Sequence, residues 1–168
     1  MSPAGAAISA AVVCALLLGS SGAPSSAEIT VMGMVYCDIC SNNSFSTHSY
    51  FLPGVQVKME CTFKVIAPRT AEQIWFSVNR TTNNHGIYKL QLSSVDGVQC
   101  ARDKQLANFC KATLISSPSS CNSPGFRTTT DQIAVKSRRA NACIYSLDPL
   151  NYRPPRRDDA VCGTIPQS

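Results

Sequence analysis

The segment Val55–Cys61 reads VQVKMEC, and its apolar and polar residues alternate without a break. Successive side chains of a β-strand point to opposite faces, so this segment would place its apolar side chains on one face and its polar ones on the other. Pro53-Gly54 stands directly before it and is a turn signal. We therefore predict a half-buried strand that begins after a turn, and Thr62–Ala67 either extends this strand or pairs back on it.

Short strand-like segments recur along the rest of the chain, separated by Gly, Pro, Asn and Ser. They are Ile29–Cys37, Ile74–Val78, Ile87–Leu92, Lys111–Ser116 and Gln132–Val135. No segment keeps a helical period over three turns, and Lys104–Phe109 is the one short helix candidate. About seven short strands with turn residues between them predict an all-β fold, a small antiparallel β-barrel or sandwich. Gly33 lies inside the first segment and predicts a bulge or the close approach of another group.

The N-terminal segment Met1–Ala27 has the features of a secretory signal peptide. It carries no charged side chain and contains the apolar run Ala10–Leu18. As a helix this run would span about 13 Å, which is too short to cross a bilayer and suits a signal peptide. Ser25–Ala27 fits a small-x-small cleavage site. We predict a signal peptide over residues 1–27 and one mature domain over 28–168 without a membrane span; a retained apolar N-terminal helix is the alternative.

Cysteine content sets the expected redox state of the mature chain. The 168 residues include nine cysteines, and cleavage would remove Cys14 and leave an even number, eight. Because the secretory lumen is oxidising, these cysteines are expected in disulfides. With 44% hydrophobic and 15% charged residues, the chain can also bury a core. We expect a β-domain with a real hydrophobic core that disulfides hold together.

Cys37-Asp38-Ile39-Cys40 is a Cys-x-x-Cys motif, which can be a redox pair, half of a zinc site or two separate structural bridges. No helix pattern follows it, and no second closely spaced cysteine pair exists, so structural bridges are favoured. The two histidines, His48 and His85, lie in polar segments. No nucleophile elbow, phosphate loop or spaced pair of carboxylates is present. We predict no catalytic residues, no cofactor and no metal site.

Two sequons support export, since N-glycosylation takes place in the secretory pathway. They begin at Asn42 and Asn79, and both asparagines are N-glycosylation candidates. A glycan needs space around its attachment point, so each asparagine is expected on a surface loop.

Positive charge is concentrated near the C-terminus. Between residues 127 and 157 the acidic residues are Asp131 and Asp148, and the excess of basic residues there equals the whole net charge of +5. The basic residues are Arg127, Lys136, Arg138, Arg139, Arg153, Arg156 and Arg157. Such a segment fits an acidic polymer, for example de-esterified pectin, or an anionic partner surface, while a solvated basic surface is the alternative. Export and the lack of an aromatic-basic platform argue against nucleic acid.

Several motifs occur together in a fixed order along the mature chain. They are Gly33–Cys40 (GMVYCDIC), Leu52–Val55 (LPGV), Gly86–Tyr88 (GIY), Phe109–Ser117 (FCKATLISS) and Asp148–Leu150 (DPL). In this ordered set the mature chain resembles the pollen Ole e allergen/extensin-like family of plants over nearly its whole length. The first motif is the most specific element of the resemblance.

The resemblance implies a disulfide pattern. Family members typically have six cysteines in three bridges, which correspond here to Cys37–Cys121, Cys40–Cys162 and Cys61–Cys110. This chain departs from the pattern in having two further cysteines, and we predict that they form a fourth bridge, Cys100–Cys143. The fold that the family implies is a small antiparallel β-barrel or sandwich, in agreement with the strand pattern.

The resemblance also implies a function. The family has no established catalytic activity and includes secreted pollen and cell-wall glycoproteins, some of which are allergens. We therefore expect a monomeric, secreted, non-catalytic binding or signalling module of the plant extracellular space or cell wall, with a role in pollen-tube or wall development. Its partner would be a receptor ectodomain or an acidic wall polysaccharide such as pectin. The alternatives are a small secreted wall-modifying enzyme and a structural wall protein.

Overall fold

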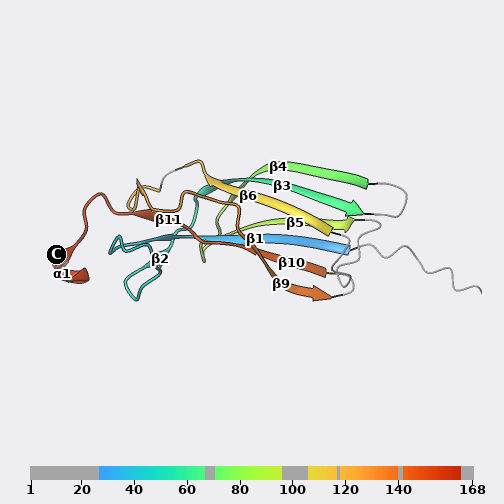
Figure 1. Cartoon of the computed structure of the whole chain (residues 1–168). Coiled ribbons are helices and arrows are strands. Elements are labelled where there is room, and N and C mark those ends of the chain that lie inside the picture. The colour runs from blue at the N-terminus through green and yellow to red at the C-terminus, as the bar shows by residue number, and fades with distance from the viewer. Residues whose placement is uncertain (1–26, 67–70, 96–105, 117, 140–141, 164–168) are drawn as a thin grey trace, which may run out of the picture.

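The computed structural model describes residues 27–66, 71–95, 106–116, 118–139 and 142–163. The predicted signal peptide, except Ala27, lies outside these ranges, and so does Cys100. Figure 1 shows an elongated molecule built almost wholly of strands, with the single-turn helix α1 (Asp159–Cys162) at one end. Within the described residues, no helix is long and apolar enough to cross a membrane.

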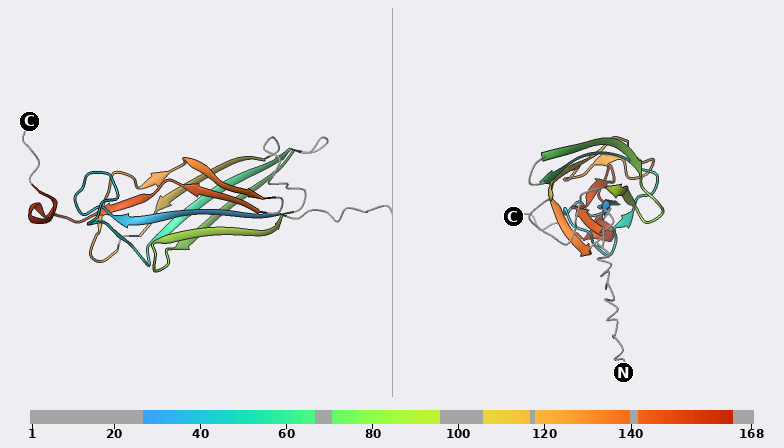
Figure 2. Two further views of the ribbon diagram at one scale, coloured as in Figure 1. Left: turned by 90° about the horizontal axis from the view of Figure 1, so that it is seen from below. Right: turned by 90° about the vertical axis from the view of Figure 1, so that its right-hand side faces the viewer.

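The strands form two sheets that lie face to face (Figure 2). The seven-stranded sheet contains β1 (Ala27–Cys37), β2 (Tyr50–Phe51), β5 (Ile87–Val95), β7 (Ser123–Pro124), β9 (Ile133–Arg139), β10 (Ala142–Leu147) and β11 (Leu150–Arg153). The four-stranded sheet contains β3 (Gln56–Ile66), β4 (Ala71–Thr81), β6 (Leu106–Leu114) and β8 (Thr129–Thr130), in the order β4-β3-β6-β8. The all-β sandwich predicted from the strand pattern is confirmed, and the sheets do not close into a barrel.

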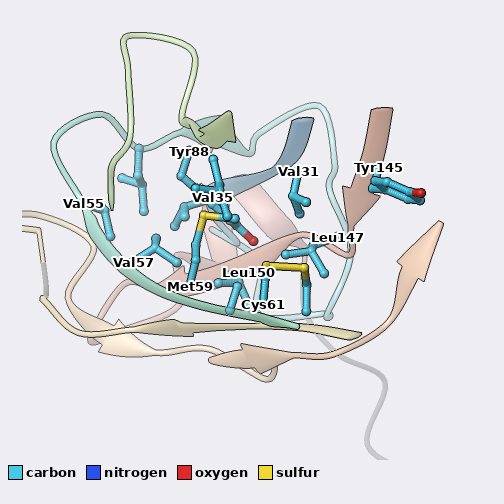
Figure 3. Packing of buried hydrophobic residues seen from close by; sticks show 14 of the residues in the cluster. Val31, Val35, Val55, Val57, Met59, Cys61, Tyr88, Tyr145, Leu147 and Leu150 are labelled. Atoms are coloured by element: carbon cyan, nitrogen blue, oxygen red, sulfur yellow. A yellow bond between two sulfur atoms is a disulfide. The ribbon is translucent and has the colours of Figure 1, made fainter. Parts of the chain in front are cut away.

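The core lies between the two sheets, and β3 contributes one complete face to it. Val57, Met59 and Cys61 are fully buried, while Lys58 and Glu60 between them point outward and form an ion pair. From the other sheet, β1 and β5 supply apolar side chains that include Val31, Val35 and Tyr88 (Figure 3). Leu90 of β5 belongs to the same cluster. Burying one such side chain stabilises the fold by about 1.5–3 kcal/mol before entropy is counted. The alternation in the β3 sequence therefore predicted its buried face correctly.

The pairing of β1 differs from a purely antiparallel arrangement. Along its first half β1 lies between β5, which is antiparallel, and β10, which is parallel. Along its second half it lies between β2, antiparallel, and β11, parallel. Parallel partners need a long crossover connection, and more than 100 residues separate Glu28 from its partner Ala142. β1 is thus a central strand, and the C-terminal strands β10 and β11 return to it.

The helix expected over Lys104–Phe109 is wrong for the part that the structure describes. Leu106–Leu114 is the strand β6, which pairs with β3 along nine residue pairs. Cys110 and Ala112 face the core, while Phe109 and Lys111 are exposed, so the segment has period two. Pairing with β3 rather than local propensity decides its conformation.

Candidate functional site

Disulfides connect distant parts of the described chain. The bridges are Cys37–Cys121, Cys40–Cys162 and Cys61–Cys110, the same pairs that the family resemblance implies. Cys61 and Cys110 face each other directly across β3 and β6. Cys143 is also disulfide-bonded, and its expected partner Cys100 lies outside the described residues. Neither cysteine of the Cys-x-x-Cys motif is a thiol here, since each is bridged to a distant segment.

Asp38 organises the turn between the two bridged cysteines. Its carboxylate is fully buried and accepts N–H bonds from Asn42 at 3.3 Å and Asn43 at 2.7 Å. Ser41 and Asn43 have φ of 51° and 59°, a left-handed conformation that costs non-glycine residues about 1 kcal/mol or more. The bonds to Asp38 offset this cost, so the aspartate of the motif has a structural role. Among the described residues, no three His, Cys, Asp or Glu side chains come together as a metal site.

The loop after this turn packs through aromatic side chains. The Phe45 ring stacks on Phe51 with centroids 5.0 Å apart, and it meets Tyr36 edge-on at 5.3 Å. Both histidines are exposed, and the backbone N–H of His85 donates to the Asn83 side chain. Burial raises the pKa of the Tyr36 hydroxyl, with a smaller contribution from Asp38. The ring contacts of Phe45 with Tyr36 and Phe51 therefore help to fix the conformation of the loop after β1.

Three of the predicted basic residues lie at the α1 end of the molecule (Figure 1). Arg153 is exposed, donates to the Pro124 carbonyl and lies over the Phe126 ring, 5.9 Å from its centroid. Arg156 is exposed, while Arg157 donates to the carbonyls of Cys162 and Gly163 at the end of α1. Asp158 and Asp159 stand directly beside this group in the sequence.

The remaining basic residues are placed elsewhere. Arg127 forms an ion pair with Asp148 at 2.9 Å, so its charge is largely compensated. Lys136, Arg138 and Arg139 belong to β9, an edge strand whose far end lies at the opposite end of the molecule from α1 (Figure 1). The side chains of these three residues lie outside the described part. The basic segment is thus divided between the two ends of the long axis.

The two sequons occupy different kinds of structure. Asn42 is exposed in the loop after β1, and its Oδ1 accepts bonds from the Ser44 backbone N–H and from the Ser44 hydroxyl. Asn79 is also exposed, but it lies on β4 opposite Lys58. The expectation that both asparagines lie on loops is therefore wrong for Asn79, because β4 continues through the polar residues at its end.

Sequence reasoning missed an exposed pair of aromatic side chains on the outer face of the four-stranded sheet. Trp75 on β4 is 62% exposed and Phe109 on β6 is 52% exposed. A signal for Trp75 was present, since it has the same parity as the polar residues Ser77 and Asn79 of its strand. Phe109 likewise shares the parity of Lys111, but the helix expected over Lys104–Phe109 includes Phe109 and hides this alternation.

No family model matches the chain. Among solved structures, the chain is similar to the crystal structure of the major plantain pollen allergen Pla l 1, with a TM-score of 0.49 and 21% sequence identity. The similarity covers 79% of this chain and 98% of that chain.

Proposed function

We propose that this protein is a secreted, non-catalytic glycoprotein of the plant extracellular space or cell wall, a member of the pollen Ole e allergen/extensin-like family, that acts as a binding or signalling module in pollen-tube or wall development. The observation that carries the proposal is the set of disulfides between distant segments. Such bridges form and persist in oxidising compartments, which supports secretion. The residues of the first family motif support membership through their structural roles.

These roles explain the motif GMVYCDIC residue by residue. Gly33 leaves room for the ring of Tyr88 from the neighbouring strand β5. Cys37 and Cys40 anchor two bridges, and Asp38 holds the turn between them. A motif used in this way stabilises a scaffold, so the binding surface has to be sought on other residues.

For the acidic partner, a pectin chain or an anionic receptor ectodomain, we propose two separate contact regions. One is the pair Arg153 and Arg156 beside α1, and the other is the basic stretch of β9 with Arg138 and Arg139. Exposed charges attract a polyanion over a distance of about one Debye length, so the contact should weaken as salt rises. Their separation lets each be tested alone.

The test is a pull-down of the oxidised, secreted chain on de-esterified pectin at low and high salt. We expect retention at low salt, and loss of most of it at high salt. Replacing Arg153 and Arg156 with Ala, or Arg138 and Arg139 with Ala, should identify the contact. The variant Lys89→Ala with Lys111→Ala, which removes the same charge elsewhere, serves as the control. Retention that is insensitive to salt, or unchanged in both arginine variants, would contradict a basic contact surface.

A further inference from the structure

The outer face of the four-stranded sheet carries two aromatic rings in one row. Trp75 on β4 and Phe109 on β6 are both direct partners of Thr62 on the strand between them, β3. Directly opposed residues point to the same face of a sheet, so all three side chains project from the outer face. We call these three residues the aromatic row.

Exposure of this row is not caused by a shift of register. On the same strands the adjacent residues Phe76 and Cys110 pack into the core, as the alternation requires. Large aromatic side chains are mostly well buried in proteins, so two of them more than half exposed in one row are informative. Thr62, between them, has a small side chain and is itself partly exposed.

Polar side chains form the next row along the strands. It consists of Ser77, Glu60 and Lys111, which face outward at partner positions of β4, β3 and β6. Beyond it lie Asn79, Lys58 and Thr113, also on the outer face. These two polar rows offer hydroxyl, amide, carboxylate and ammonium groups about 7 Å and 13 Å from the aromatic row.

The charged side chains of the two polar rows leave one net positive charge, and Lys64 of β3 lies in the row on the other side of the aromatic row, where its side chain is outside the described residues. Lys58 Nζ lies 2.9 Å from Glu60 Oε1, which leaves Lys111 as the exposed charge without an opposite charge in these rows. The two polar rows present both hydrogen-bond donors and acceptors, which suit a ligand that is rich in hydroxyl groups.

We propose that this face binds a neutral, extended β-linked hexose chain that runs across the strands. The C–H faces of sugar rings stack on aromatic rings, while their hydroxyls bond the adjacent polar row. Trp75 and Phe109 lie two strand spacings apart, about 10 Å. This distance is close to one disaccharide unit of an extended β-glucan, so alternate sugar rings of one chain would meet the two aromatic rings. The site is separate from the basic surfaces, and binding to it does not require them.

Trp75 is the only tryptophan of the chain, so its fluorescence reports this face directly. Titrating the oxidised, secreted protein with cellohexaose should give a saturable change in tryptophan emission that is the same at low and high salt. Phe109→Ala should weaken the apparent affinity by at least about tenfold, because one of two stacking positions is lost. Calorimetry should show the same loss for Trp75→Ala, whereas Phe126→Ala, an exposed aromatic elsewhere, should bind as the original chain does.

Four outcomes would overturn the proposal. The first is no saturable change with cellohexaose, and the second is binding that Phe109→Ala leaves intact. The third is an emission shift that depends on protein concentration alone, which would make the face an interface between two copies. The fourth is that, without any added ligand, the tryptophan emission of the original chain already differs from that of Asn79→Gln. The glycan of this chain itself would then cover the aromatic row.

Discussion

Asp38 is fully buried, and its carboxylate accepts hydrogen bonds from two backbone N–H groups of one turn. Removing the carboxylate in Asp38→Ala leaves the N–H groups of Asn42 and Asn43 without this acceptor, and Asn43 is one of the two left-handed residues of the turn. We expect a loss of about 1–3 kcal/mol of unfolding free energy, measured by chemical denaturation. Asp131→Ala, at an exposed aspartate, is the control and should stay within about 0.5 kcal/mol of the original. Equal stability of the two variants would refute this role of Asp38.

Tyr88 presents the opposite case, a buried polar group without compensation. Its ring fills the core, but its hydroxyl has no hydrogen-bond partner among the described residues. A buried hydroxyl without a partner costs free energy, so Tyr88→Phe should raise the unfolding free energy by about 1 kcal/mol. Tyr50→Phe, at an exposed tyrosine, should leave it nearly unchanged. A destabilised Tyr88→Phe would mean that the hydroxyl makes a favourable contact.

The same residue makes stability depend on alkaline pH. Burial raises the pKa of the Tyr88 hydroxyl above its ordinary range, and the charge of Asp148 adds to this. Because the unfolded chain loses this proton first, stability is full below the ordinary pKa of about 10 and falls as the pH rises toward the folded value. Tyr88→Phe should therefore lose stability less steeply than the original chain above about pH 10. Parallel curves for the two proteins would contradict this contribution.

At the scale of elements, one glycine of β1 makes room for a large side chain of the neighbouring strand β5. Gly33 faces Tyr88 across the two strands, and a Cβ at position 33 would overlap the Tyr88 hydroxyl and ring. Gly33→Ala should cost about 1–3 kcal/mol by overpacking. In a Tyr88→Leu background the same change should cost much less, because the overlapping atoms are gone. A double-mutant cycle by denaturation measures this coupling, and additive effects would exclude the contact as the cause.

The exposed pattern of β4 and β6 also belongs to this scale. Among the residues whose burial is described, 73–81 of β4 and 109–114 of β6, each strand has an inner face that is partly or fully buried and an outer face that is polar except for one aromatic residue. Trp75 and Phe109 depart from the polar pattern at the same height of the sheet. A departure at two paired positions is what distinguishes a candidate binding row from scattered exposed side chains.

For the whole molecule, the bridge Cys40–Cys162 fastens the C-terminal segment with α1 to the end of β1. In the variant Cys40→Ala with Cys162→Ala, trypsin should cleave after Arg156 and Arg157 at least about tenfold faster, because local opening no longer requires the bridge. The midpoint of thermal unfolding should fall as well, because the unfolded chain is no longer constrained by a long closed loop. The loss of unfolding free energy has an upper limit of about 4–5 kcal/mol.

The matched control is Cys61→Ala with Cys110→Ala. This pair lies in the core between β3 and β6, far along the chain from the arginines, so its removal should lower global stability without selective cleavage at Arg156. Mass spectrometry of the fragments distinguishes the two patterns. If both variants release the same C-terminal peptide at the same rate, the bridge Cys40–Cys162 does not hold this segment.

Local pattern was sufficient for much of the fold. Alternation predicted the buried face of β3 and the inward residues Tyr88 and Leu90 of β5, because side-chain direction in a strand repeats every two residues whatever the partner is. The interpretation of Gly33 as a point of close approach is confirmed by Tyr88. The predicted disulfide pairs came from a family resemblance and not from spacing.

The amino-acid sequence by itself determined the strand faces, the turn signals and the all-β class, since each of these depends on residues that are near neighbours along the chain. Only the tertiary structure decided that β10 and β11 run parallel to β1 and that Leu106–Leu114 is a strand. It alone divided the basic segment and brought Trp75 and Phe109 to either side of Thr62. These features depend on backbone hydrogen bonds between segments far apart in the chain, and such bonds set both strand order and register.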